Sequence, residues 1–326
     1  IRYVNGTGPY SQWRYRDFTS NDEYGGYYMG LALTYKYLKN ESSVNGTLAL
    51  MIDQVCAGMI RANFLGINGY GAPTGVDQKM RFFSGASWAL LVLKMGALAF
   101  PEKYADTYWH FVTEELQGYF GAREGGIQEI VSNYYAYNFG IDLVFALIML
   151  EDNPTLRAKY IQNFEESLYS YVRYHRNPYF NALYLVAKNF SYGDNEIIER
   201  DVEDQLMEFD INHFPDVYQG VEPPGPEYKY VNFSKYIDFF NNHLIGRLFK
   251  PLFMEFRVED RDFYDRPLTV KMSNTNIFMW DRNPFTPASN SINLAHEEPG
   301  ASYFTPYWLM RGFLGMPGTG VRGPWI

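Results

Sequence analysis

Apolar side chains recur at helical spacing along most of this chain, and this spacing is the feature that most restricts its fold. The first run repeats at intervals of three and four residues and consists of Tyr24, Tyr28, Leu31, Tyr35 and Leu38. A second run with the same intervals extends over 48–60. Residues three and four apart share one face of an α-helix, so each run predicts an amphipathic helix with one buried stripe.

Further runs with helical spacing follow, separated by breaks at proline and glycine. They cover 84–100, 102–120, 127–150, 153–174, 179–190, 194–210, 231–258 and 300–314. Proline and clustered glycine interrupt helices because proline lacks the backbone donor and glycine favours turns. Strand signals are few and short. The sequence therefore predicts an all-α fold.

The predicted helices alternate in polarity. The run 134–150 is apolar nearly all round, whereas 102–117 and 157–174 carry charged residues on one side. This contrast is expected between helices enclosed by others and helices that face water. In a chain of 326 residues the alternation predicts an α/α toroid of antiparallel helix pairs, formed by a single domain over 1–326.

Two long loops interrupt the predicted helices. The loop over 215–230 contains Glu222-Pro-Pro-Gly-Pro-Glu227, and successive prolines hold the backbone extended. The loop over 267–299 mixes Pro, Asn, Ser and Thr with large apolar residues. Loops this long in compact domains tend to be functional or disordered, and the Trp and Phe content of 267–299 favours an ordered loop.

The composition defines a folded globular protein and excludes several partners. The chain is 47% hydrophobic and 20% charged, which allows a large core. Its net charge of −9, without clustered Lys or Arg, argues against nucleic acid or an anionic membrane as the main partner. The two most apolar runs, 84–100 and 134–150, fall short of the roughly 20 residues that span a bilayer, so we expect no membrane span.

Sequons indicate a secreted or cell-surface glycoprotein. Five Asn-X-Ser/Thr sequons begin at Asn5, Asn40, Asn45, Asn189 and Asn232. The sequence starts at Ile1 instead of Met, as expected of a chain whose leader has been removed or of a fragment. The single cysteine, Cys56, lies in an apolar helical run, so we expect no intramolecular disulfide and an inert, buried thiol.

The stretch SNDEYGGYY, residues 20–28, is the first candidate site. Ser20 and Glu23 have the spacing of a capping box, and Asp22 would lie in the first helical turn, where the helix dipole favours a carboxylate. Alternatively, Asp22 or Glu23 faces a sugar ring at the mouth of the toroid, beside Tyr24. Both interpretations hold if Glu23 caps the helix while Asp22 stays exposed.

Two further stretches combine acids with arginine. Asp77 and Arg81 follow a glycine-rich loop and are four residues apart, which is typical of an ordinary pair on a helix surface. Near the C-terminus, Trp280-Asp281-Arg282 and Glu297 belong either to a solvated ion-pair network or to a carbohydrate-facing edge. In the second case the Trp280 ring stacks on a sugar while the charged groups bind hydroxyls.

Glycoside cleavage requires one protonated carboxyl group and a second carboxylate that acts as base or nucleophile. The candidate acids are Asp22, Glu23, Asp77, Asp281 and Glu297. The candidate substrate-binding residues are Tyr24, Arg81, Trp280 and Arg282. The five histidines lack zinc-ligand spacing, and neither a P-loop nor a nucleophile elbow occurs, so we expect no metal and no cofactor, although an acidic loop at 260–262 is compatible with calcium.

Three segments carry a resemblance to known proteins. They are Trp13-Arg-Tyr-Arg-Asp-Phe-Thr-Ser-Asn-Asp22-Glu-Tyr-Gly-Gly, Trp280-Asp-Arg-Asn-Pro-Phe285 and Pro306-Tyr-Trp-Leu-Met-Arg311-Gly. With them the chain resembles a group of uncharacterised secreted microbial proteins with α/α-toroid folds. The helix-pair pattern is more distantly similar to that of (α/α)6-barrel glycoside hydrolases and polysaccharide lyases. The resemblance implies a fold and assigns no catalytic residue.

Two functions follow as expectations. The first is a secreted protein that binds a carbohydrate or polysaccharide and cleaves it as a glycoside hydrolase or lyase. The second is a non-enzymatic surface glycoprotein or filament subunit that keeps the toroid as a scaffold and self-associates through a tyrosine-rich surface, since 29 Tyr and 25 Phe are present. The ectodomain of a transmembrane protein is a third interpretation.

Overall fold

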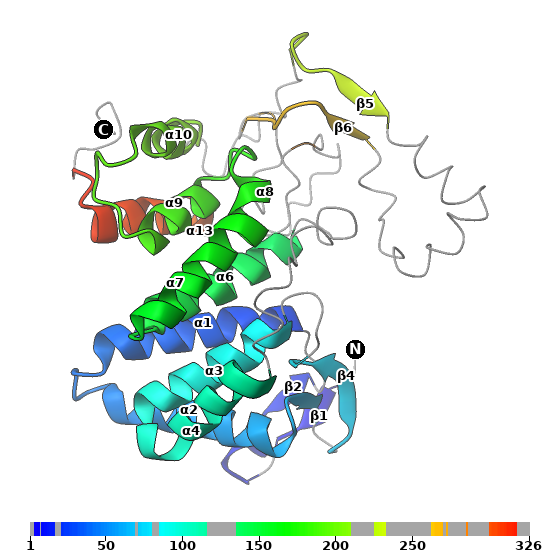
Figure 1. Ribbon diagram of the computed structural model, residues 1–326. Coiled ribbons are helices and arrows are strands. Elements are labelled where there is room, and N and C mark those ends of the chain that lie inside the picture. Colours follow the sequence, from blue (N-terminus) through cyan, green and yellow to red (C-terminus); the bar gives the residue numbers. More distant parts are fainter. Residues whose placement is uncertain are drawn as a thin grey trace. The chain divides into compact units, whose positions relative to one another are not determined.

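The computed structural model describes residues 3–6, 8–16, 21–68, 71–79, 85–115, 135–209, 225–232, 262–269, 272, 285 and 300–317. Of these residues 66% lie in helices, which confirms the all-α class (Figure 1). The chain divides into two compact units. Unit 1 consists of Ile1–Glu124 and Phe139–Phe164, and unit 2 consists of Gly125–Asn138 and Glu165–Ile326.

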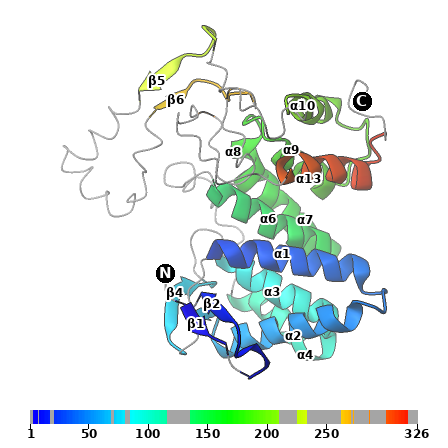
Figure 2. The ribbon, with the colours of Figure 1, turned by 180° about the vertical axis from the view of Figure 1, so that it is seen from behind.

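Unit 1 is built on helices that pack on their neighbours in sequence, α1 with α2, α2 with α3 and α3 with α4, while α1 also contacts α3 (Figures 1 and 2). Their bounds are α1 Asn21–Leu38, α2 Asn45–Arg61, α3 Gly85–Ala99, α4 Pro101–His110, its π-helical continuation η2 Phe111–Glu115, and α7 Pro154–Asn163. Helix α6, Tyr135–Leu150, contributes 139–150 to this unit. Phe100 alone links α3 to α4.

Two antiparallel hairpins complete unit 1. In the first, β1 (Tyr3–Asn5) pairs with β2 (Arg14–Arg16) across a loop that holds the 3-10 turn η1 (Gly8–Tyr10). In the second, β3 (Leu65–Ile67) pairs with β4 (Pro73–Asp77). The second hairpin takes up part of the stretch that the sequence predicts as a glycine-rich loop.

In unit 2, helix α9 contacts both α10 and α13, and α10 also contacts α13. The helical elements are η3 Phe164–Tyr169, whose first residue belongs to unit 1, α8 Ser170–Val172, α9 Pro178–Ala187, α10 Glu196–Met207, α13 Ala301–Leu309 and η9 Met310–Leu314. A hairpin joins β5 (Tyr230–Asn232) to β6 (Asp262–Tyr264). The helix predicted over 231–258 is therefore wrong at its first two residues, which lie in a strand, and the rest of that range is outside the described residues.

The β5–β6 hairpin links the two long loops that the sequence predicts. Residues 225–229 form a turn before β5, and Asp265 exchanges hydrogen bonds of 2.9 Å with Lys229. The amide of Tyr264 donates to the carbonyl of Phe285 at 2.7 Å. Three-residue strands add little stability alone, so these cross-links fix the loop ends.

Asparagine side chains cap the N-termini of α7, α9 and α10, and two of these asparagines directly precede a proline. The side chains of Asn153, Asn177 and Asn195 accept hydrogen bonds from backbone amides in the first turns of α7, α9 and α10. Pro154 and Pro178 occupy the first helical position, where no backbone donor is needed. The sequence breaks predicted at these two prolines are confirmed as helix starts.

Buried and amphipathic helices alternate along the chain. Almost every described side chain of α3, α6 and α9 is buried, whereas α2, α4, α7 and α10 each bury one face. This confirms the contrast in polarity that the sequence predicts. No helix in the described part of the chain is long and apolar enough to cross a membrane.

The single thiol marks a close approach of helices. Cys56 of α2 is buried, its Sγ donates to the carbonyl of Val92 at 3.0 Å, and burial raises the pKa of the thiol to about 12. A side chain at Gly96 of α3 would place its Cβ 2.7 Å from this sulfur and 3.0 Å from the Tyr104 ring. Glycine at position 96 therefore lets α2, α3 and α4 meet, and the thiol belongs to the core as predicted.

Asparagine also ends α2 and α9, in the same way. Asn63 and Asn189 take left-handed backbone conformations with φ of 51° and 58°. In each case the next residue, Phe64 or Phe190, donates its amide five residues back, to Met59 and Leu185 respectively. This is the Schellman arrangement, which satisfies the last carbonyls of a helix, and asparagine tolerates its left-handed position.

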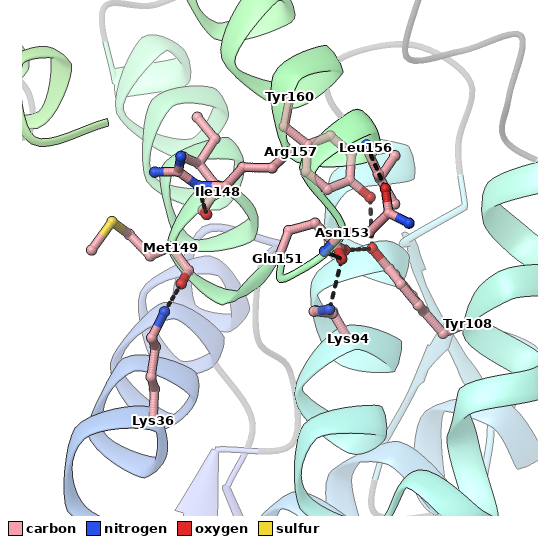
Figure 3. A network of polar contacts seen from close by, with 10 residues as sticks. All are labelled: Lys36, Lys94, Tyr108, Ile148, Met149, Glu151, Asn153, Leu156, Arg157 and Tyr160. Carbon is pink, nitrogen blue, oxygen red and sulfur yellow. Dashed lines mark hydrogen bonds and ion pairs between the residues drawn. The ribbon is translucent and has the colours of Figure 1, made fainter. Parts of the chain in front are cut away.

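A buried polar network binds the helices of unit 1 together (Figure 3). Glu151, at the end of α6, is 4% exposed. Its Oε1 accepts from Lys94 Nζ of α3 at 3.0 Å and from the amide of Asn153 at 2.9 Å. Its Oε2 accepts from the Tyr108 hydroxyl of α4 at 2.6 Å, and Tyr160 of α7 in turn donates to Tyr108 at 2.8 Å.

The end of α6 gains two further donors from neighbouring helices (Figure 3). Lys36 of α1 donates to the carbonyl of Met149, and Arg157 Nε of α7 donates to the carbonyl of Ile148 at 3.1 Å. The last carbonyls of a helix lack intrahelical partners and carry partial negative charge, so cationic donors stabilise them. The C-terminal end of α6 is thus the polar centre of unit 1.

We expect Glu151→Gln to destabilise the protein by about 3 kcal/mol, because Lys94 would be buried without its counter-ion. Tyr160→Phe removes one hydroxyl and is expected to cost about 1 kcal/mol. Urea unfolding measures both, with the exposed Glu102→Gln on α4 as control. Equal midpoints for Glu151→Gln and wild type would show that the network contributes no stability.

Unit 2 contains a histidine that makes its stability pH-dependent. The His175 ring lies edge-on against Phe285, with centroids 5.0 Å apart, and burial lowers the pKa of His175 to about 4. In the unfolded chain this pKa returns to about 6.5. Between these values the unfolded state binds a proton that the folded state does not, so folded stability falls as pH drops from about 6.5 to about 4.

We expect His175→Phe to flatten the dependence of the urea midpoint on pH within this window, because phenylalanine keeps an aromatic ring but binds no proton. The comparison is a set of unfolding curves for variant and wild type at several pH values from 4 to 7. An unchanged slope would contradict a titrating role for His175.

Candidate functional site

The first predicted site stretch lies at the start of α1. The helix begins at Asn21, so Asp22 is in the first turn, as predicted, although its side chain is outside the described residues. Glu23 is exposed, and its Oε1 pairs with Arg16 Nη1 at 3.5 Å. This pair connects the end of β2 to the first turn of α1. The capping box with Ser20 stays a prediction because Ser20 is not among the described residues.

Tyrosines follow Glu23 on the same helix. Tyr24 is half-buried, with its ring centroid 5.6 Å from that of Tyr28, and burial together with the nearby Glu23 charge raises the pKa of Tyr24. Tyr28 is buried, whereas Tyr27 is 43% exposed. The surface near Glu23 thus presents aromatic rings and neutral hydroxyl groups.

Asp77 lies at the end of strand β4, and its placement corrects the sequence interpretation. The predicted helix-surface pair with Arg81 requires a helix at Asp77, but Val76 and Asp77 are in a strand that pairs with β3. Asp77 Oδ1 instead accepts from the amide of Lys79 at 2.8 Å. β-Branched Thr74 and Val76 favour the strand, and the periodicity of so short a segment gave no signal of it.

Gln78 brings the two stretches together. The side-chain Oε1 of Gln78 accepts from the Tyr28 hydroxyl of α1 at 3.2 Å, and the backbone N–H of Gln78 donates to the carbonyl of Phe64 at 2.9 Å. Glu23, Tyr24 and Asp77 therefore belong to segments that meet in unit 1 through one hydrogen bond. Gln78 is completely buried, yet its Nε2 has no hydrogen-bond partner. Such a group is rare in folded proteins and marks an incompletely satisfied polar junction.

Lys79 extends this junction on the other side. Its Nζ donates to Asn63 Oδ1 at 2.6 Å and lies 5.7 Å from the ring centroids of both Phe64 and Phe111. The consecutive left-handed residues Asn63 and Phe64 place these groups next to β3. A bulky left-handed residue such as Phe64 is uncommon and is often found near functional sites.

The remaining predicted site residues lie outside the described residues; they are Arg81, Trp280, Asp281, Arg282 and Glu297. Convergence of the two ends of the chain on one site therefore stays a prediction. No group of three or more His, Cys, Asp or Glu side chains in the described ranges is placed to hold a metal ion.

The predicted glycosylation sites differ in exposure. Asn5 lies exposed in β1, Asn40 lies exposed in the turn after α1, and Asn189 is exposed at the left-handed position after α9. Asn45 is half-buried at the first residue of α2. Asn232 lies in β5, and its side chain is not described.

Hairpin β1–β2 is a surface that the sequence analysis missed. Its register places Tyr3 opposite Arg16 and Asn5 opposite Arg14, so these four side chains share one face. A side chain at Gly6 would put its Cβ 1.9 Å from the carbonyl oxygen of Tyr10, so only glycine fits there. The sequence signal available was Asn5-Gly6 followed by Gly8-Pro9, a combination typical of turns.

Helix α13 presents a second aromatic surface, in unit 2. Tyr303 and Tyr307 stack with ring centroids 5.7 Å apart, and the guanidinium of Arg311 lies 5.6 Å from the Trp308 ring centroid. Phe304 and Trp308 point outward and are more than half exposed. The third of the segments that carry the resemblance begins in this helix at Pro306 and ends in η9 at Gly312.

A buried polar chain in unit 2 was also missed. Tyr169 donates to Asn181 Oδ1 at 2.9 Å, and Asn181 Nδ2 donates to Asp201 Oδ2 at 2.7 Å. Burial raises the pKa of Asp201. Asp201 is one of five acidic residues in 196–204, which in sequence look like a solvated helix face.

Comparisons with protein-family models, with curated proteins and with solved structures found no match for this chain.

Proposed function

We propose that this chain is a secreted glycan-binding protein whose binding site lies in unit 1, where the start of α1 meets the end of β4. The observation that carries this proposal is the Tyr28–Gln78 hydrogen bond of 3.2 Å. It joins the stretch with Glu23 and Tyr24 to the stretch with Asp77, two segments about 50 residues apart in sequence. The scaffold we propose is the α/α toroid, supported by the alternation of buried and amphipathic helices.

The chemistry at this junction suits a sugar. Aromatic rings offer apolar faces to the C–H groups of a pyranose, and carboxylates accept hydrogen bonds from its hydroxyl groups. Tyr24 and Tyr27 supply rings, and Glu23 and Asp77 supply carboxylates, from neighbouring backbone segments. The side-chain Nε2 of Gln78, which has no hydrogen-bond partner, adds a donor beneath this surface, whereas the two carboxylates are acceptors.

Cleavage of the bound glycan is the second part of the proposal. Hydrolysis or elimination requires two carboxyl or equivalent groups in different protonation states. Glu23 and Asp77 are the described candidates, while Asp22, Asp281 and Glu297 complete the set proposed from sequence. The reaction class we propose is therefore that of a glycoside hydrolase or polysaccharide lyase with acids drawn from this set.

We expect Tyr24→Ala to weaken glycan binding about tenfold, because loss of a stacking ring removes roughly 1–2 kcal/mol of contact. The control is Tyr37→Ala, which removes an exposed tyrosine from the last turn of the same helix. A polysaccharide panel identifies a ligand, and calorimetry measures its affinity for each variant. Equal losses in both variants, or no ligand in the panel, would contradict the proposed site.

We expect Glu23→Gln and Asp77→Asn to lower cleavage at least about 100-fold while binding persists, because general acid–base groups contribute factors of that order. Release of reducing ends measures cleavage of either type, and absorbance of an unsaturated product distinguishes a lyase. Asp106→Asn, at an exposed position of α4, is the matched control. Full activity in Glu23→Gln and Asp77→Asn would remove both acids from the reaction.

A further inference from the structure

The hairpin β1–β2 carries aromatic side chains that unit 1 leaves uncovered. Every residue from 8 to 16 is exposed, and the exposed fractions of Tyr10 and Trp13 reach 67% and 63%. Tyr3 and Tyr15 on the strands are exposed as well. A two-stranded hairpin is marginally stable in water on its own, and Trp and Tyr are enriched at protein interfaces.

The charge of this hairpin is opposite to that of the rest of the chain. Positions 1–16 hold three arginines, Arg2, Arg14 and Arg16, and no acidic residue. The other positions together hold 25 basic and 37 acidic residues, a net charge of −12. The protein therefore has a small basic, aromatic segment attached to a strongly acidic body.

The basic charge is available for a partner. Arg14 forms no ion pair with any described residue, and it shares its face of the hairpin with Arg16. Arg16 pairs with Glu23 at 3.5 Å, but both side chains are about half exposed, and such pairs contribute little. Arginine pairs well with carboxylates at protein interfaces and is enriched there together with Trp and Tyr.

We propose that hairpin β1–β2 docks on the acidic surface of a second copy of this chain. Charge complementarity favours a second copy as the partner. Residues 17–326 of one copy carry a net charge of −12 and attract the basic hairpin of the next copy. Antiparallel pairing of two β2 edges about Tyr15 is disfavoured, because Arg14 of each copy would lie opposite Arg16 of the other. The contact therefore joins two different surfaces, and such head-to-tail contacts produce rings or open filaments instead of closed dimers.

The test is sedimentation velocity of the full chain over a range of concentrations, at about 0.02 M and about 0.5 M salt, since salt screens exposed charges. We expect assemblies that grow with concentration at low salt and dissociate at high salt. Trp13→Ala and Arg14→Glu each lower the association constant at least about tenfold. Trp308→Ala and Arg200→Glu, at exposed positions of α13 and α10, leave it unchanged.

Three results would overturn the proposal. One is a monomer at every concentration and salt tested. Another is a closed dimer that resists salt, which indicates an apolar, symmetric contact. The third is an association constant for the Trp13→Ala and Arg14→Glu variants that equals the wild-type value. If Trp13→Ala instead abolishes glycan binding in a protein that stays monomeric, the occupant of the hairpin is a glycan.

Discussion

The structure of unit 1 depends on one carboxylate held out of water. Removing the charges of Glu151 and Lys94 from water costs several kcal/mol for each ion, and only a complete set of partners offsets this cost. Glu151 has that set, namely an ammonium, a hydroxyl and a backbone amide within 3.0 Å. Because these donors belong to α3, α4 and the start of α7, they also hold these three helices at the C-terminal end of α6 (Figure 3).

The sequence predicts most of the helices because the signals that specify them lie within each segment. Periodic apolar residues, prolines at first turns and asparagines before them are all local signals. The described helix bounds agree with the predicted ranges for α1, α3, α9 and α13 to within a few residues. Strands β1 to β6 were not foreseen, since each is three to five residues long and depends on a partner strand elsewhere.

The candidate site shows the same division between local and distant causes. Acids beside tyrosine at 22–24 stand out in the sequence, and the structure keeps Glu23 and Tyr24 at the surface of a helix start. Gln78, which connects them to Asp77, has no distinguishing sequence context, because its role depends on a hydrogen bond to Tyr28. Likewise, an acidic helix such as α10 looks solvated in sequence, whereas Glu199 and Glu203 are buried.

The buried thiol of Cys56 has a consequence for the redox chemistry of the folded chain. Thiol–disulfide exchange proceeds through the thiolate, and a pKa of about 12 leaves almost none of it at neutral pH. The 326 residues contain no second cysteine, so they form no internal disulfide for a reducing medium to break. In the folded chain Cys56 is therefore shielded from exchange with glutathione, because exchange requires an accessible thiolate.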